Sequence, residues 1–253
     1  MKRSWYLGLT ASDIGRHCIL VGDPGRVELF AARLDGARVM NEDRGLRTVT
    51  GTFADVPVTV TAFGMGAPIA TIVLEELASL GAQAILRAGT AMSTGPDVPL
   101  GSFVVGLAGY RGEGTSPSYA PPAYPAVADP SLSAAVSAEL ARRDLVHHDG
   151  IIASFDAFYR EMLAHNAGEV DRVTAQLAEL RRLGVIAADM ETAALLVVGS
   201  ILRVHVGSLC LVTVDGSTRA TLEDGARDAG ERQLIDVALA AVASLGHQLQ
   251  SRV

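Results

Sequence analysis

The sequence predicts an α/β protein with a well-buried core, and two observations carry that prediction. Of the 253 residues, 49% are hydrophobic but only 5% are aromatic, and Ala, Val, Leu and Gly dominate, as in sheets covered by helices. Short apolar runs also alternate with segments of helical period, and glycine turns separate them. No internal repeat or linker interrupts the chain, so residues 1–253 are expected to form a single domain.

Each element is predicted from its local pattern. Short apolar runs bounded by turn residues predict strands at 18–21, 56–63, from Ala84 to about Arg87, 102–107, 150–154, 185–188 and 208–214. Apolar residues that recur every three or four positions predict helices at 26–34, 69–80, 132–143, 167–183, 193–202 and 232–249. A polar stretch rich in Gly and Pro predicts a long surface loop over 109–130. The strand–helix–strand order should cross over right-handedly and place the Ala84 strand in a parallel region.

Three glycine-marked turns follow predicted strand ends. They contain Gly22, the run Gly64-Met65-Gly66, and the pair Gly89-Thr90. In open α/β sheets, ligands bind beyond the carboxyl ends of the strands, so these turns are expected to converge on one crevice. Neither a dinucleotide fingerprint nor a phosphate-loop lysine motif occurs in the chain.

Two arginines lie beside these turns. Arg87 ends an apolar strand, where an unpaired buried charge is costly, so it needs either an ion-pair partner or an oxyanion such as phosphate. Arg26 falls in the first turn of a predicted helix, where the helix dipole does not favour a cation. It is therefore either an anion ligand or a solvated helix residue.

Further polar and aromatic residues occur at two other predicted element ends. Asp189-Met190-Glu191 precedes an apolar helix, where the acids are either capping groups or parts of a site. Phe158 and Tyr159 follow the strand at 150–154, where core packing and ligand contact are both open.

Composition and sequence pattern exclude several other classes. A formal net charge of −7 argues against a nucleic-acid-binding face. Cys18 and Cys210 both lie in apolar runs and are expected to be buried thiols, with no disulfide framework and no metal-ligand spacing. The N-terminus lacks the apolar core of a signal peptide, and no run reaches membrane-spanning length, so a cytoplasmic protein without a membrane partner is expected.

Five motifs in one order resemble the nucleoside phosphorylase family, which includes uridine phosphorylase and hexameric purine nucleoside phosphorylase. These motifs are Gly22-Asp23-Pro24-Gly25-Arg26, Gly64-Met65-Gly66-Ala67-Pro68, Leu86-Arg87-Ala88-Gly89-Thr90, Asp156-Ala157-Phe158-Tyr159 and Asp189-Met190-Glu191. The resemblance is closest to uridine phosphorylase. It implies a three-layer αβα fold with a mixed, partly barrel-like sheet. It also implies phosphorolysis of a nucleoside to a free base and (deoxy)ribose 1-phosphate, with inorganic phosphate as co-substrate and no cofactor or metal. A homo-hexamer built from dimers with shared active sites is implied as well.

The resemblance also assigns roles to individual residues. Phosphate binding is implied for Gly22, Arg26, Arg87, Thr90 and, from a neighbouring subunit, Arg44. Ribose binding is implied for Tyr6, Thr90, Met190 and Glu191, with Glu191 accepting hydroxyl protons. Contact with the base is expected for Gly89, Phe158, Arg160, Asp189 and Asp215.

Several positions depart from the uridine branch. Tyr6 replaces a histidine, and Gly45 replaces an acid associated with a bound monovalent cation, so no such ion is expected. The Gln-x-Arg pair that reads uracil is absent after Tyr159, and Arg160 is the available substitute. In a purine phosphorylase Asp215 would be the acid that protonates the base. A turn at Asp215-Gly216 also explains this residue fully, and that interpretation is favoured.

Two further alternatives stay open. A hydrolase of nucleosides on the same fold would lack the arginine clamp, and Arg26, Arg44 and Arg87 oppose it. A non-catalytic nucleoside-binding relative is the third hypothesis, because the uracil-reading pair is missing.

Overall fold

One mixed sheet runs through the protein. The computed structural model describes residues 3–250 of the chain. Within them the strands are β1 (His17–Val21), β2 (Asp35–Asn41), β3 (Thr48–Phe53), β4 (Val56–Ala62), β5 (Ala84–Ser93), β6 (Phe103–Arg111), β7 (Ala126–Val127), β8 (His147–Ser154), β9 (Val185–Asp189) and β10 (His205–Asp215). The α-helices are α1 (Pro24–Ala31), α2 (Ala67–Ser79), α3 (Pro130–Arg142), α4 (Val170–Arg182), α5 (Thr192–Leu202) and α6 (Asp224–Gln250).

Part of this sheet closes on itself. The strand order is β10-β6-β8-β9-β5-β1-β4-β3-β2, and β10 also pairs with β5. Strands β10, β6, β8, β9 and β5 therefore form a closed five-stranded barrel, from which the remaining strands extend as an open sheet. The short β7 pairs with β6 at the side. The expected mixed, partly barrel-like sheet is confirmed.

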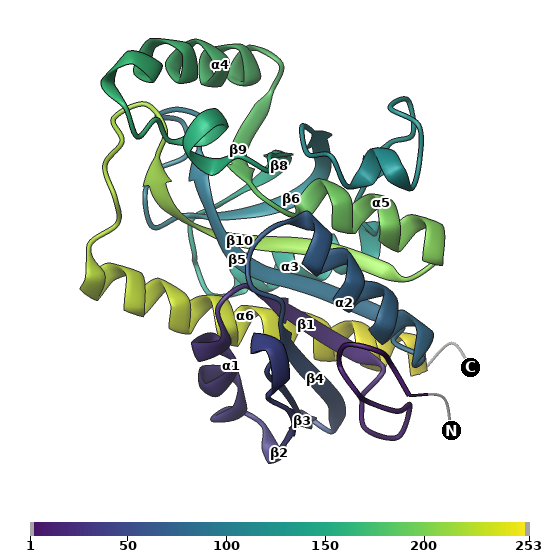
Figure 1. Cartoon of the computed structure of the whole chain (residues 1–253). Coiled ribbons are helices and arrows are strands. Elements are labelled where there is room, and N and C mark those ends of the chain that lie inside the picture. Colours follow the sequence, from purple (N-terminus) through teal and green to yellow (C-terminus); the bar gives the residue numbers. More distant parts are fainter. Residues whose placement is uncertain (1–2, 251–253) are drawn as a thin grey trace.

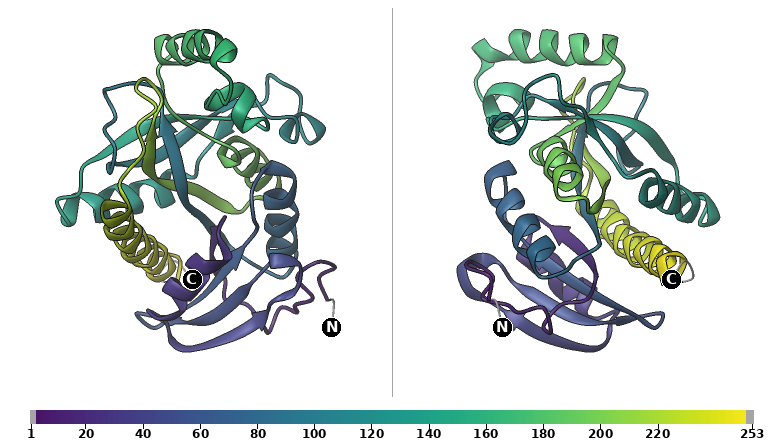
Figure 2. Two further views of the ribbon diagram at one scale, coloured as in Figure 1. Left: turned by 60° about the vertical axis from the view of Figure 1, so that its left-hand side comes forward. Right: turned by 90° about the vertical axis from the view of Figure 1, so that its right-hand side faces the viewer.

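Helices cover both faces of the sheet. Helices α2 and α5 pack together over one face, and α1, α3 and α6 cover the other, with α4 at one end of the molecule (Figures 1 and 2). Each face has its own hydrophobic core: one groups Leu20, Leu74 and Leu196, the other Phe30, Phe103 and Leu239. This is the three-layer αβα arrangement that the sequence predicts.

Strand β5 is the central strand. It is parallel to β1 and to β10, as expected for the strand that begins at Ala84. The predicted end near Arg87 is wrong, because the strand continues to Ser93 and there pairs antiparallel with β9. Gly89 and Thr90 therefore lie within the strand and not in a turn after it. The sequence did not indicate this, because a change of partner along one strand leaves no local signal.

Two further predictions from the sequence need correction. The chain over 35–53 forms the hairpin β2–β3, which was not predicted, because β2 is an edge strand with mostly exposed positions and no apolar alternation. The expected loop over 109–130 is not structureless: β6 runs on to Arg111, a 3₁₀ turn occupies Ser116–Ser118, and β7 follows.

Arg111 holds the chain that follows β6. Its guanidinium donates to Ser116 Oγ and to the carbonyl oxygens of Ala120, Pro121, Pro122 and Tyr124, four of the five at 2.7–2.9 Å and Pro122 at 3.3 Å. Backbone carbonyl groups that take part in no β-sheet pairing thus accept hydrogen bonds from one side chain. These bonds explain how a segment rich in Gly and Pro is ordered.

Cys18 and Cys210 are both fully buried and unbridged, as predicted. Across residues 3–250, no helix combines the length and the apolar character needed to cross a membrane.

Replacing Arg111 tests the order of this segment. We expect Arg111→Ala to lower the free energy of unfolding by roughly 2 kcal/mol or more, because several carbonyls lose their donor together. Chemical denaturation measures this effect, and limited proteolysis should cut within 112–125. The control is Arg142→Ala, which removes the ion pair between the exposed Arg142 and Glu139 and should leave the free energy of unfolding close to that of wild type. Equal effects of the two variants would contradict the anchoring role.

Candidate active site

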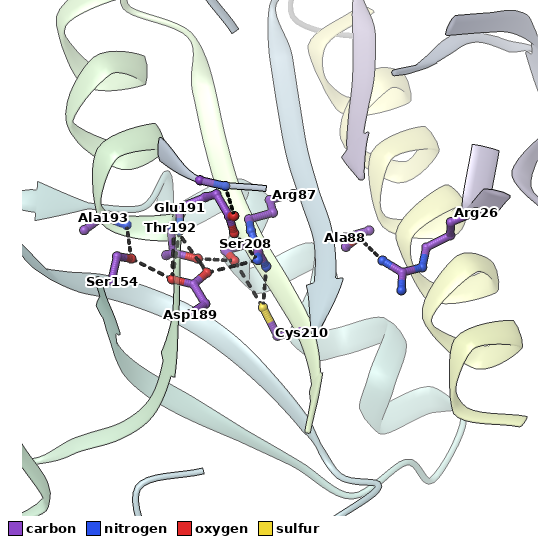
Figure 3. A network of polar contacts seen from close by, with 11 residues as sticks. Arg26, Arg87, Ala88, Ser154, Asp189, Glu191, Thr192, Ala193, Ser208 and Cys210 are labelled. Atoms are coloured by element: carbon purple, nitrogen blue, oxygen red, sulfur yellow. Dashed lines mark hydrogen bonds and ion pairs between the residues drawn. The ribbon is translucent and has the colours of Figure 1, made fainter. Parts of the chain in front are cut away.

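Arg87 lies at the centre of a buried polar network (Figure 3). Its side chain projects from β5 and only 5% of the residue is exposed. Nη2 lies 2.6 Å from Glu191 Oε2 and 3.2 Å from Asp189 Oδ2, and Nη1 donates to Cys210 Sγ at 2.8 Å. Arg87 therefore has the ion-pair partners that a buried charge requires. Its Nε, however, is buried with no hydrogen-bond partner among the described residues.

Glu191 joins three elements at one carboxylate. It precedes α5, its Oε2 accepts from Arg87, and its Oε1 accepts the Gly66 N–H at 2.7 Å. The glycine turn that begins α2 is thus bonded to the start of α5. Burial raises the pKa of Glu191, Arg87 opposes this, and the nearby Asp189 adds to it. A buried acid with a raised pKa is typical of a functional site.

Asp189 is a buried acid beside Glu191 with several hydrogen-bond donors around it. The residue is 3% exposed, and its oxygens accept from the hydroxyls of Ser154 at 2.6 Å and Thr192 at 2.5 Å. They also accept the backbone N–H groups of Glu191 and Thr192 at 3.2 Å. This is the capping role that the sequence left open. The expected contact of Asp189 with the base stays a prediction.

Arg26 is buried as well. Only 5% of it is exposed, so the solvated-helix alternative is wrong. Nη2 donates to Glu231 Oε1 of α6 at 3.0 Å, Nη1 lies 3.4 Å from the Ala88 carbonyl oxygen, and Nε has no partner among the described residues. The Arg26 guanidinium thus lies beside residue 88 of β5, the neighbour of Arg87. The two arginines bind different protein groups and lie on either side of β5 in Figure 3.

The first two glycine turns lie side by side. The Gly64 N–H donates to the Gly22 carbonyl at 3.0 Å, next to the parallel ends of β1 and β4. A Cβ on Gly22 would lie 2.9 Å from the Gly64 carbonyl oxygen, so only glycine fits this contact. The predicted convergence of these two turns is confirmed.

Gly89 makes room for the Arg87 side chain. A Cβ at residue 89 would lie 2.6 Å from Arg87 Cζ, which is far inside van der Waals contact. Gly89 stands opposite Cys210 in the β5–β10 register, so the guanidinium lies over the backbone at this point. Thr90 is half-buried on the same strand.

Tyr6 and Arg44 pair on the surface, away from these groups. Arg44 Cζ lies 5.7 Å from the centroid of the Tyr6 ring, within cation–π range. Glu76 of α2 fixes the backbone there by accepting the N–H groups of Tyr6 and Leu7 at 2.7 and 2.8 Å. Arg44 has a left-handed backbone with φ of 58°. Its arrival at a neighbouring subunit's site stays a prediction.

Phe158 and Met190 lie against the same hydrophobic cluster, which includes Met92, Phe155 and Met162. Phe158 begins a short π-helical turn (Phe158–Met162) after β8, a geometry common at functional sites. Arg160 is largely exposed and pairs with both oxygens of Glu169 at 2.6 Å. The expected use of Arg160 in place of the uracil-reading pair therefore has no support in this arrangement.

Asp215 caps a turn. Its Oδ1 accepts the N–H groups of Ser217 and Thr218 at 2.7 and 3.0 Å and the Ser217 hydroxyl at 2.6 Å. Burial would raise the pKa of Asp215, but these hydrogen bonds outweigh it and the pKa is lowered. An acid that protonates a base needs a raised pKa, so the geometry favours the turn interpretation.

Other contributors were not predicted. They are the Gly66 N–H, Glu231, Cys210 and the hydroxyl pair Ser154 and Thr192. Glu231, Cys210 and Ser154 meet their partners across large sequence separations, so no local motif marks these contacts. The Gly66 N–H lies in a glycine turn that the sequence did mark, and Thr192 lies three residues after Asp189, but neither contact was predicted. No group of three or more His, Cys, Asp or Glu residues within the described chain could hold a metal ion.

Comparison with known proteins identifies the superfamily of this chain. A family model described as the phosphorylase superfamily matches residues 16–244, and the chain belongs to this superfamily. The uridine phosphorylase of Treponema pallidum (strain Nichols) is 36% identical over 221 residues, which cover 87% of this chain and 86% of that protein. A guanosine phosphorylase of Halorubrum lacusprofundi is 30% identical over 226 residues, covering 89% and 88%. The crystal structure of a uridine phosphorylase from Vibrio fischeri ES114 superposes with a TM-score of 0.87 at 26% identity, covering 96% and 98%.

A methyl group at residue 89 tests the buried network. We expect Gly89→Ala to displace the Arg87 guanidinium, break its pair with Glu191, and lower the free energy of unfolding by roughly 3 kcal/mol, measured by chemical denaturation. The control is Gly225→Ala near the start of α6, where a Cβ meets nothing within 4 Å. That change should be neutral or stabilise by a few tenths of a kcal/mol (about 0.5). A Gly89→Ala protein as stable as wild type would contradict the geometry.

Proposed function

We propose that this protein cleaves a pyrimidine nucleoside, uridine in the first place, by phosphorolysis to the free base and ribose 1-phosphate. The observation that carries the proposal is the pair of buried arginines, Arg26 and Arg87, whose Nε–H groups have no hydrogen-bond partner among the residues that the structure describes. A buried N–H without an acceptor is costly, and a phosphate oxygen is a fitting acceptor for a guanidinium. The likeness to proteins named uridine phosphorylase supports the same reaction.

Phosphate is the nucleophile in this proposal and needs no cofactor or metal. At neutral pH it is already anionic, so the protein has to hold it beneath the anomeric carbon. Arg26, Arg87, Gly22 and Thr90 are the proposed ligands, because arginine forks and open glycine backbone suit an oxyanion. Fixing its position turns an encounter into a near-attack geometry. As the glycosidic bond stretches, the phosphate charge stabilises the positive charge that grows on the sugar.

Glu191 is the proposed acceptor for the ribose hydroxyls. Its carboxylate is fixed by Arg87 and by the Gly66 N–H, so it is oriented before the sugar arrives. Met190 and Phe158, which pack on one cluster, are the proposed apolar contacts for sugar and base. Tyr6 would contact the sugar at the position where uridine phosphorylases have a histidine.

Completing the site requires a second subunit. We propose that Arg44 and Tyr6, which form one pair on the surface, are contributed together to the site of a neighbour, in a hexamer built from dimers. Glu76 would then position the contributed segment through the Tyr6 and Leu7 backbone.

A purine nucleoside is the second candidate, and the guanosine phosphorylase among the relatives favours it. This candidate needs a group that protonates the leaving purine. The lowered pKa of Asp215 leaves that residue ionised, which opposes the alternative.

A phosphate-dependence assay tests the proposal. Uridine, thymidine, inosine, guanosine and adenosine are each incubated with and without inorganic phosphate, and both base and sugar phosphate are quantified. We expect uridine to be cleaved only with phosphate, giving equal amounts of uracil and ribose 1-phosphate. Cleavage without phosphate would indicate a hydrolase, preference for guanosine or inosine would favour the purine candidate, and no turnover would favour a binding protein.

The raised pKa of Glu191 predicts a pH profile. Glu191 must be ionised to accept a hydroxyl proton, so kcat/KM for uridine should fall as the pH decreases through the pKa of this group. Since burial raises that pKa, the fall should begin above the pH at which an exposed glutamate titrates, about 4.5. We expect Glu191→Gln to lower kcat/KM by about 100-fold or more and to lack this acid limb.

Glu179→Gln is the control for this profile. Glu179 is exposed on α4 and pairs with Arg182 at 2.7 Å, so its loss should leave the acid limb in place. An identical acid limb in Glu191→Gln and wild type would assign the titration to another group.

A further inference from the structure

The segment after β8 is held by side chains that donate to its backbone. We call residues 157–166, which include Phe158, the base-side segment. Its carbonyl groups at residues 160 and 161 accept from Arg172 and from Gln176 Nε2 of α4, the latter at 3.1 Å. On another side, Arg219 Nη2 donates to the Ala164 carbonyl oxygen at 2.7 Å. Donors from two separate elements thus hold one segment.

This segment needs such donors because it lies outside the sheet. It contains one π-helical turn, whose last carbonyls have no intrahelical partner. Side-chain donors supply the missing bonds, so the position of the segment depends on where those side chains are fixed.

Arg219 is fixed by an ordered turn after β10. The Asp215 N–H donates to the Ala220 carbonyl at 2.9 Å, and the Arg219 N–H donates to the Asp215 carbonyl at 2.7 Å. The Asp215 carboxylate caps the same turn. Arg219 has a left-handed backbone with φ of 65°, a conformation uncommon for a residue with a side chain. Such a conformation persists only where the surrounding structure imposes it, and it is common at functional sites.

The hydrogen bond ends on a buried part of the segment. Ala164 and Met162 are each 3% exposed and belong to the cluster on which Phe158, Met190 and Val214 pack. Arg219 therefore ties the turn at the end of β10 to the chain that carries Phe158. A shift of the segment would move Phe158 relative to Met190 without touching Arg26 or Arg87.

We propose that Arg219 is a positioning residue for the nucleoside base, which acts by holding the base-side segment through the Ala164 carbonyl. This inference rests on the proposed nucleoside phosphorylase activity. Because the phosphate ligands lie on other elements, the effect of Arg219 falls on the affinity for the nucleoside and not on the affinity for phosphate.

The test uses Arg219→Gly and a matched control. Glycine removes the guanidinium and adopts a positive φ without strain, so the turn itself is kept. The control is Arg203→Gly, at an exposed arginine that ends α5 with φ of 58°, where the same change in the same backbone conformation leaves the segment untouched. Arg219→Lys keeps an N–H donor on a long side chain.

Steady-state kinetics and hydrogen exchange are measured on the full-length variants. For Arg219→Gly we expect KM for uridine to rise about three- to tenfold, as for one lost hydrogen bond, with KM for phosphate within about twofold of wild type. Amides of residues 157–166 should exchange faster than in wild type, while those of β5 are unchanged. Arg203→Gly should match wild type, and Arg219→Lys should recover part of the loss.

Each other outcome has a distinct meaning. A wild-type protein without phosphorolysis overturns the proposed function. An active wild type whose Arg219→Gly variant keeps its KM for uridine, or loses affinity for both substrates equally, overturns the positioning role. Unchanged hydrogen exchange in the base-side segment would also overturn it.

Discussion

A single buried arginine shared by two buried carboxylates is the constraint on which the rest of the site depends. Arg87 can stay charged in the core because Glu191 and Asp189 face it, and the two acids can approach each other because Arg87 lies between them. Each of the three is then fixed by further hydrogen bonds, Asp189 by hydroxyls and backbone and Glu191 by the Gly66 N–H. The network therefore aligns β5, β9, α5 and the α2 turn at one point, and the carboxylate offered to a ribose is oriented by the fold itself.

Closure of the barrel makes this network possible. Strand β5 pairs with β1 along its first half and with β9 at its end, and β10 follows it throughout. Gly89 lies where these partners change, and its missing side chain gives the Arg87 guanidinium a place over the backbone. Cys210 on the facing strand contributes a small apolar wall and a sulfur acceptor. Side chains larger than these two would push the guanidinium away from Glu191.

Local patterns predicted the elements and the residue types of the site, and long-range geometry decided their roles. Apolar runs, glycine turns and helical spacing were sufficient for β1, β4, α2 and α5, and the motifs around Arg26, Arg87 and Glu191 marked the candidates. The edge hairpin β2–β3 gave no apolar alternation, and the extension of β5 depends on partners remote in sequence. Asp189 and Arg160 illustrate this: their residue types suggested contact with a base, and the fold gives them protein partners, Ser154 and Thr192 for Asp189 and Glu169 for Arg160, that the sequence did not indicate. Only the folded chain shows which acceptor a donor meets.

The charges around Arg87 give a physical reason for the proposed sharing of the site between subunits. Glu231 pairs with both Arg26 and Arg227, whereas Arg87 alone faces the two carboxylates of Asp189 and Glu191, so it is the group around Arg87 that holds more carboxylates than cations. A phosphate dianion placed there would be repelled unless another cation arrives or a carboxyl takes up a proton. The raised pKa of Glu191 lowers that repulsion only where the acid is protonated, which removes its use as a proton acceptor. An additional arginine would remove both difficulties at once, and this is the physical argument for the proposed contribution of the exposed Arg44 from a neighbouring subunit.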